Sequence, residues 1–82
     1  MVSTSNLSKY NKAFMDTFML EEDKLEGLKY QAIDDWDSVG HMTLIAVLEE
    51  IFDIELDTDD IIDFSGYEEG RDILKKYNVI TE

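Results

Sequence analysis

The sequence predicts a small all-α protein, and three observations support that prediction. Apolar residues recur at helical spacing in several separate segments, and no segment shows the strict alternation of a half-buried strand. Proline is absent, so nothing interrupts long helices. The length of 82 residues fits one domain. We therefore expect a single domain over residues 1–82, folded as a small four-helix bundle with a short third helix and a long loop between the first two helices.

The first helix is expected over about residues 5–19, followed by a loop over 21–37. The inward face of the helix consists of Leu7, Tyr10, Phe14 and Phe18, which share one helical stripe. Gly27 and several charged residues favour a loop after it. Isolated apolar residues are expected to hold this loop against the bundle, namely Leu25, Leu28, Ile33 and Trp36. A short helix over about 23–31 remains an alternative.

The second helix is expected over 38–52, where Asp37 or Ser38 can cap the first amides. It carries two apolar stripes, so it is either deeply buried or presents one stripe to a partner. The inward stripe is Leu44, Leu48 and Ile51, with Phe52 beside it. The second stripe is Val39, Met42 and Ala46.

The last two helices are expected over 59–64 and 66–77. Thr58 is the candidate cap of the shorter one, which would insert Ile61, Ile62 and Phe64 into the core. A capping box from Ser65 to Glu68 would open the longer one. Its inward face is predicted to consist of Ile73, Tyr77 and Ile80.

Charge is distributed unevenly along this chain, whose net charge is −13 at pH 7. Between Tyr30 and Gly70 there are thirteen acidic residues and neither Lys nor Arg. Such a surface would repel nucleic acid, and it would attract and steer basic protein surfaces. The alternative interpretation is an acidic face that only keeps the protein soluble.

Cysteine is absent, which excludes disulfides and cysteine-based metal sites. The first residues hold no apolar block of the length that a secretory signal requires. The longest apolar run, Leu44 to Leu48, is far shorter than the ~20 residues that span a bilayer. We expect a cytoplasmic, monomeric protein without a membrane span.

Ser38 is the candidate functional residue, because it opens a helix directly after the long loop. A helix start offers free N–H groups and a partial positive charge to a phosphate ester. The residues around it form a series: Asp37-Ser38-Val39-Gly40-His41-Met42, Leu44, Leu48-Glu49-Glu50-Ile51-Phe52-Asp53-Ile54-Glu55, Asp60-Ile61 and Phe64. This series closely resembles the acyl carrier protein family. The resemblance covers Trp36 to about Tyr77, whereas residues 5–31 match only in pattern.

The resemblance implies that Ser38 carries a 4′-phosphopantetheine arm, transferred covalently from coenzyme A by a phosphopantetheinyl transferase, with Asp37 beside it. It implies no catalytic activity of the chain itself, because the thiol of the arm bears the cargo as a thioester. Partners would be acyl-activating or acyl-transferring enzymes with basic docking surfaces. The apolar contacts would be Val39, Met42 and Ala46, and the acidic contacts Asp37, Glu49, Glu50, Asp53 and Asp57. The cargo stays open between a fatty acyl, a polyketide and an aminoacyl group.

Four residues near Ser38 need separate interpretation. Gly40 is either a small residue tolerated near a helix start or a position that leaves room for a partner to approach Ser38. His41 is either a solvated helix-face residue or a donor to the phosphate. Trp36 is expected to anchor the loop in the core. Thr43, where many family members have an acid, puts the identity of the partner in doubt.

Three other functions were weighed. A calcium loop starting at Asp53 would have Thr58 where glycine is needed and Phe64 where a bidentate glutamate is needed, so no metal site is predicted, although weak divalent binding stays open. A serine hydrolase using Ser38, His41 and Asp37 lacks the G-x-S-x-G elbow. A non-catalytic helical adaptor that carries no arm is the main rival.

Overall fold

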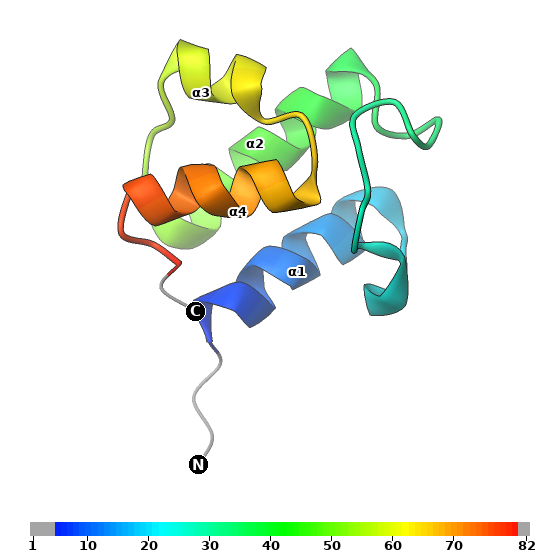
Figure 1. Cartoon of the computed structure of the whole chain (residues 1–82), viewed down its shortest axis with the longest axis horizontal. Helices are drawn as coiled ribbons and strands as arrows, with labels where there is room; N and C mark the ends of the chain where they lie inside the picture. The colour runs from blue at the N-terminus through cyan, green and yellow to red at the C-terminus, as the bar shows by residue number, and fades with distance from the viewer. Residues whose placement is uncertain (1–4, 81–82) are drawn as a thin grey trace.

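The computed structural model describes residues 5–80 and confirms the all-α prediction (Figure 1). Its elements are α1 (Asn6–Phe18), the 3₁₀ helix η1 (Glu22–Lys24), α2 (Ser38–Phe52), α3 (Thr58–Asp63) and α4 (Tyr67–Lys76). Within these residues no strand forms, and the only extended pairing is an isolated bridge between Lys29 and Gly66. No helix in this range has both the length and the apolar character needed to cross a membrane.

Helix α1 begins with a side-chain cap and ends in a left-handed residue. Ser5 Oγ accepts a hydrogen bond from the amide of Ser8 at 3.0 Å, as an N-cap serine does. Met19 has a φ of 55° and donates its amide to the carbonyl of Met15, which closes the last turn. The predicted inward face is confirmed for its three aromatic residues, which are buried together with Ala13: Tyr10, Phe14 and Phe18.

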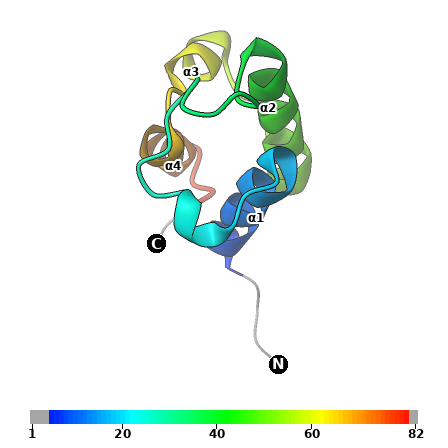
Figure 2. The same cartoon turned by 90° about the vertical axis from the view of Figure 1, so that its right-hand side faces the viewer.

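The segment between α1 and α2 is a long loop, as predicted. The alternative helix over 23–31 is wrong, because only Glu22–Lys24 forms a helical turn and Gly27 follows with a φ of 79°. Leu25, Leu28 and Trp36 are buried, so apolar anchors hold the loop as expected. Figure 2 shows the loop arching from the end of α1 across to the start of α2.

Backbone hydrogen bonds fasten this loop to the link between α3 and α4. The amide of Tyr30 donates to the carbonyl of Ser65 at 2.9 Å, and the amide of Tyr67 donates to the carbonyl of Leu28 at 2.8 Å. The carboxylate of Glu68 accepts from the amide of Gly27 at 2.9 Å. The predicted capping box from Ser65 to Glu68 is therefore wrong: α4 begins at Tyr67 with Gly66 at its cap position, and Glu68 bonds the loop instead.

Helix α3 is shifted by one residue from its predicted position and is less buried than predicted. Asp57 occupies the cap position and Thr58 is the first helical residue, so Thr58 is not the cap. Ile62 is 71% exposed, which contradicts its predicted place in the core. A helix of six residues turns only one face inward, and Ile61 occupies that face. Phe64, directly after the helix, is buried as expected.

The core beneath the start of α2 is aromatic. Trp36 is fully buried, stacks on Phe18 with ring centroids 5.3 Å apart, and meets Phe14 edge-on at 5.4 Å. Such pairs stabilise a core beyond the area that they bury. Because Trp36 lies two residues before Ser38, this packing fixes the point at which α2 begins. The prediction that Trp36 anchors the loop is confirmed.

Candidate functional site

Ser38 is the first residue of α2 and is exposed to solvent. Asp37 before it is extended and accepts the amide of Gly40 on its carboxylate at 2.8 Å, so the helix is capped by Asp37 rather than by the serine. The hydroxyl of Ser38 is thus left for other chemistry. The amides of Ser38 and Val39 belong to the first turn, whose N–H groups have no partner within a helix and favour an anion.

Gly40 is required by the loop that precedes α2. A Cβ atom added to Gly40 would lie 2.0 Å from the carbonyl oxygen of Asp35 and 3.3 Å from the ring of Phe18. Neither sequence interpretation describes this constraint, since the space is filled by the protein's own backbone. The glycine lets the loop pack tightly beneath the first turn of α2, on which Ser38 stands.

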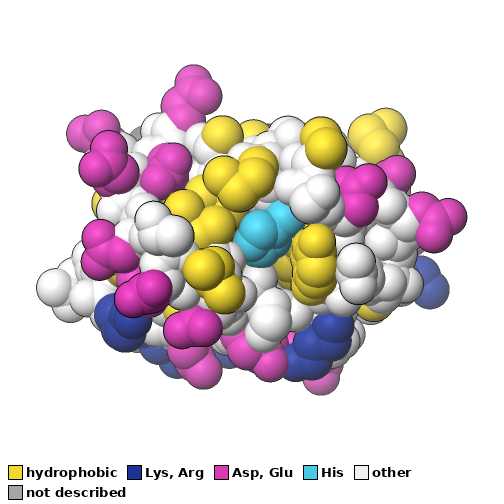
Figure 3. Space-filling model, turned by 90° about the horizontal axis from the view of Figure 1, so that it is seen from above, with side chains coloured by type: hydrophobic (Ala, Val, Ile, Leu, Met, Phe, Trp, Pro, Cys, Tyr) yellow, Lys and Arg dark blue, Asp and Glu magenta, His cyan; other side chains and the backbone are white. Residues whose placement is uncertain are grey.

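A pocket of about 340 Å³ opens beside Ser38, and we call it the Ser38 pocket. It lies between α2, the loop, α3 and the α3–α4 link, and its lining is mostly apolar. The lining residues are Tyr30, Ser38, His41, Met42, Ile61, Ile62, Phe64 and Ser65. Figure 3 shows this face of the molecule, with the single histidine in the middle of hydrophobic side chains and carboxylates around the rim.

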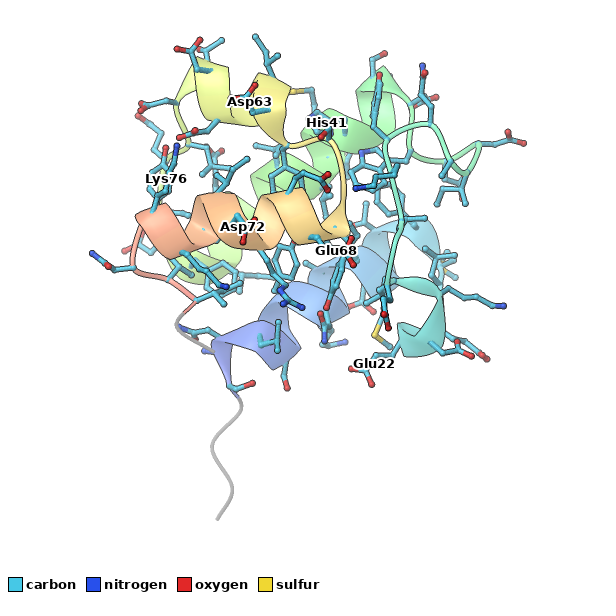
Figure 4. The ribbon with its side chains drawn as sticks, viewed as in Figure 1. Glu22, His41, Asp63, Glu68, Asp72 and Lys76 are labelled. Atoms are coloured by element: carbon cyan, nitrogen blue, oxygen red, sulfur yellow. The ribbon has the colours of Figure 1, made fainter. Side chains whose placement is uncertain are left out.

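His41 crosses the space between three elements, and its ring is only partly exposed (Figure 4). The indole Nε1–H of Trp36 donates to His41 Nδ1 at 2.9 Å. An indole nitrogen can only donate, so the ring proton of neutral His41 is on Nε2. Nε2 in turn donates to the carbonyl of Ile61 on α3 at 2.8 Å. His41 is therefore neither a freely solvated residue nor a donor to a phosphate on Ser38, and both sequence interpretations are wrong.

The same bonds do not fit a serine hydrolase that uses His41 as its base. A general base needs a free ring nitrogen within reach of the nucleophile. Both nitrogens of His41 are engaged by Trp36 and Ile61, and the carboxylate of Asp37 caps α2. Within residues 5–80 no group of three or more His, Cys, Asp or Glu side chains could hold a metal ion.

The predicted apolar contact surface is exposed on α2. Val39 is 73% exposed and Met42 52%, and the neighbouring Ala46 is exposed too. Ile62 of α3 adds a fourth apolar side chain, which the sequence interpretation assigned to the core. The first three line a shallow hollow that reaches from Ser38 to Glu50.

The predicted acidic contacts fall into two groups. Glu50, Asp53 and Asp57 are exposed. Glu49 and Asp37, in contrast, accept hydrogen bonds from the protein's own backbone: Glu49 Oε2 accepts the amide of Leu56 at 2.8 Å, and Asp37 caps α2. The sequence does not separate these groups, because adjacent glutamates on a helix look alike until the chain after the helix is placed.

Polar contacts hold α3 against α2 and α4. Lys76 Nζ donates to Asp60 Oδ1 at 2.7 Å, and the hydroxyl of Tyr77 donates to Asp60 Oδ2 at 2.6 Å. These two hydrogen bonds, that from Lys76 above all, hold the pKa of the Asp60 carboxyl below its usual value. The bond from His41 to Ile61 makes the corresponding contact to α2. Thus the wall of the Ser38 pocket that α3 supplies is fixed largely by polar side chains.

Five lining residues of the Ser38 pocket were not predicted as site residues, namely Tyr30, Ile61, Ile62, Phe64 and Ser65. They come from the loop, α3 and the α3–α4 link, and no periodicity along the sequence brings them to Ser38.

No protein-family model matches this chain, and neither a curated protein nor a solved structure matches it.

Proposed function

We propose that this protein is a carrier that holds an acyl or aminoacyl group as a thioester on a 4′-phosphopantetheine arm attached to Ser38. The observation that carries the proposal is the placement of Ser38: an exposed hydroxyl on the first turn of α2, not used as the cap, beside an apolar pocket. A non-catalytic role agrees with the occupied ring nitrogens of His41, since neither is free to act as a base for Ser38.

The residues around Ser38 fit a phosphodiester. Its oxygens would face the amides of the first turn of α2, which carry partial positive charge. No Lys or Arg lies between Tyr30 and Gly70, so the stretch that contains Ser38 supplies no basic side chain of its own. The carboxylate of Asp37 accepts the amide of Gly40 at 2.8 Å. When bound, the arm supplies the thiol that a chain without cysteine lacks.

In the loading step a phosphopantetheinyl transferase would remove the proton of Ser38. The Ser38 oxygen attacks the pyrophosphate of coenzyme A, a new ester bond forms, and adenosine 3′,5′-bisphosphate leaves. Ser38 must therefore be reachable by a second protein. The exposed side chains Val39 and Met42 beside it, with Glu50 farther along α2, give such a protein an apolar centre and an acidic edge.

Intact-mass measurement tests the proposal. Incubation with coenzyme A, magnesium and a broad-specificity transferase should raise the mass by one phosphopantetheine unit. Ser38→Ala should abolish the gain, because the first turn of α2 holds no other hydroxyl side chain. Ser65→Ala is the matched control: Ser65 is exposed and lines the same pocket, and this variant should load fully. A folded wild-type protein that stays unmodified would favour the adaptor without an arm.

A further inference from the structure

The Ser38 pocket has a limited volume. Its volume of about 340 Å³ lies near the lower end of the roughly 300–1,000 Å³ of pockets that hold small molecules. One side is formed by Met42 and Ile62, which are 52% and 71% exposed, so this side is open to water. The opposite side is the ring of His41, and beyond it lies the aromatic core around Trp36.

Hydrogen bonds at both ring nitrogens hold His41 in place between α2 and α3. Its bonds to Trp36 Nε1 and to the carbonyl of Ile61 join the loop, α2 and α3 through one ring. Tyr30 and Phe64 pack edge-on against the same ring, with centroids 5.4 Å and 6.0 Å away. The ring thus lines the pocket on the side where Trp36 and the aromatic core lie.

We propose that His41 is a specificity-determining residue that restricts the cargo of this carrier to short acyl groups. This inference rests on the proposed function and names the class of cargo that Ser38 would bear. A short acyl group can occupy the outer pocket, in contact with Met42 and Ile62, without disturbing the ring. A long chain has no further apolar space unless His41 moves.

Moving His41 breaks both hydrogen bonds at once. Trp36 is fully buried, so its indole N–H would lose its acceptor where water cannot replace it. The carbonyl of Ile61 is in the last turn of α3, where carbonyls lack partners within the helix, and it would lose its donor. The rest of a long chain therefore stays outside the pocket, where it gains little from the protein.

The test compares three loaded forms, prepared with a broad-specificity transferase from coenzyme A, butyryl-coenzyme A and hexadecanoyl-coenzyme A. Intact mass first verifies each load. The thermal midpoint is then followed by circular dichroism, and Trp36, the only tryptophan, reports the state of its bond to His41 by fluorescence. Butyryl should raise the midpoint by a few degrees above the arm alone, because it binds only the folded state. Hexadecanoyl should give no larger rise, and Trp36 emission should stay the same in all three forms.

Two variants distinguish the effect of His41 from the effect of the rest of the pocket. In His41→Ala the pocket gains the space that the ring occupied, so hexadecanoyl should now raise the midpoint more than butyryl does. Met42→Ala widens the open side of the same pocket without touching the ring, so the butyryl effect should shrink and hexadecanoyl should again add nothing. If Met42→Ala also released the limit, the assignment to His41 would be wrong.

The wild-type protein decides the question even where His41→Ala fails to fold. A larger rise of the thermal midpoint with hexadecanoyl than with butyryl, together with a shift of Trp36 emission, would overturn the role assigned to His41 and leave the proposed carrier function intact. The absence of any butyryl effect would overturn it as well. Failure of Ser38 to gain mass at all would instead remove the proposed function and this inference with it.

Discussion

Asp60 illustrates how one buried residue makes stability depend on pH. The residue is only 7% exposed, and hydrogen bonds from Lys76 and Tyr77 hold the pKa of its carboxyl below the ordinary value. The pKa of Asp60 is therefore lower in the folded than in the unfolded chain. The resulting stabilisation is complete above the unfolded pKa of about 3.9 and is lost as the pH falls through the folded value.

Replacing Asp60 by Asn should reduce this acid dependence. Urea unfolding between about pH 6 and pH 3 should show a shallower decline of the unfolding free energy for Asp60→Asn than for wild type. Some decline should remain, because Lys29 likewise lowers the pKa of Glu69. Asp59→Asn is the matched control, since Asp59 is its exposed neighbour on α3. An identical slope for Asp60→Asn and wild type would contradict the role of the two hydrogen bonds.

The residues around Ser38 show what sequence reasoning finds and misses at this scale. The position of Ser38 at a helix start and the burial of Trp36 are predicted correctly, because a helix start and an isolated apolar anchor have local signatures. Gly40 and His41 were misjudged because their partners lie elsewhere: the carbonyl of Asp35 packs under Gly40, and the carbonyl of Ile61, twenty positions along, binds His41. A sequence pattern records which residues share a face of a helix, but not which backbone groups another segment brings to it.

At the scale of elements, Glu49 and Glu50 on the acidic side of α2 have different surroundings. Glu49 accepts the amide of Leu56 and so holds the turn between α2 and α3, whereas Glu50 is exposed. Glu49→Ala should lower the unfolding free energy by about 1–2 kcal/mol, because a part-buried amide loses a charged acceptor. Glu50→Ala should change it by no more than about 0.5 kcal/mol, as surface substitutions do. Denaturant unfolding measures both, and equal effects would show that the Glu49 bond contributes nothing.

The elements differ in how far the sequence predicted them. The 3.6-residue pattern placed the bounds of α1 and α2 to within a residue. The predicted inward stripe of α2 is right for Leu44 and Leu48 but wrong for Ile51, which is 40% exposed. Helix α3 has six residues and is held mostly by Asp60 and His41, so its apolar pattern was a poor guide and Ile62 was placed on the wrong side. The start of α4 was misplaced because Glu68 bonds the loop rather than its own helix end.

At the scale of the whole molecule, charge and apolar surface are arranged around one face. Figure 3 shows hydrophobic side chains gathered about the histidine, with carboxylates along the edges. The protein carries a net charge of −13, and the stretch from Tyr30 to Gly70, which includes α2 and α3, has no basic residue to offset its acids. Such a field would speed the approach of a basic partner, as the proposed function requires.

This arrangement predicts that loading of Ser38 by a basic transferase slows as salt rises. The screening length falls from about 30 Å at 0.01 M salt to about 8 Å at 0.15 M, so kcat/KM should fall by up to about tenfold over that range. Glu50→Gln with Asp53→Asn should lower kcat/KM at low salt and converge with wild type at high salt. Asp72→Asn with Asp16→Asn is the control, because it removes the same charge from exposed positions on α4 and α1. Equal slowing by both double variants would mean that net charge, not the acidic edge of α2, steers the encounter.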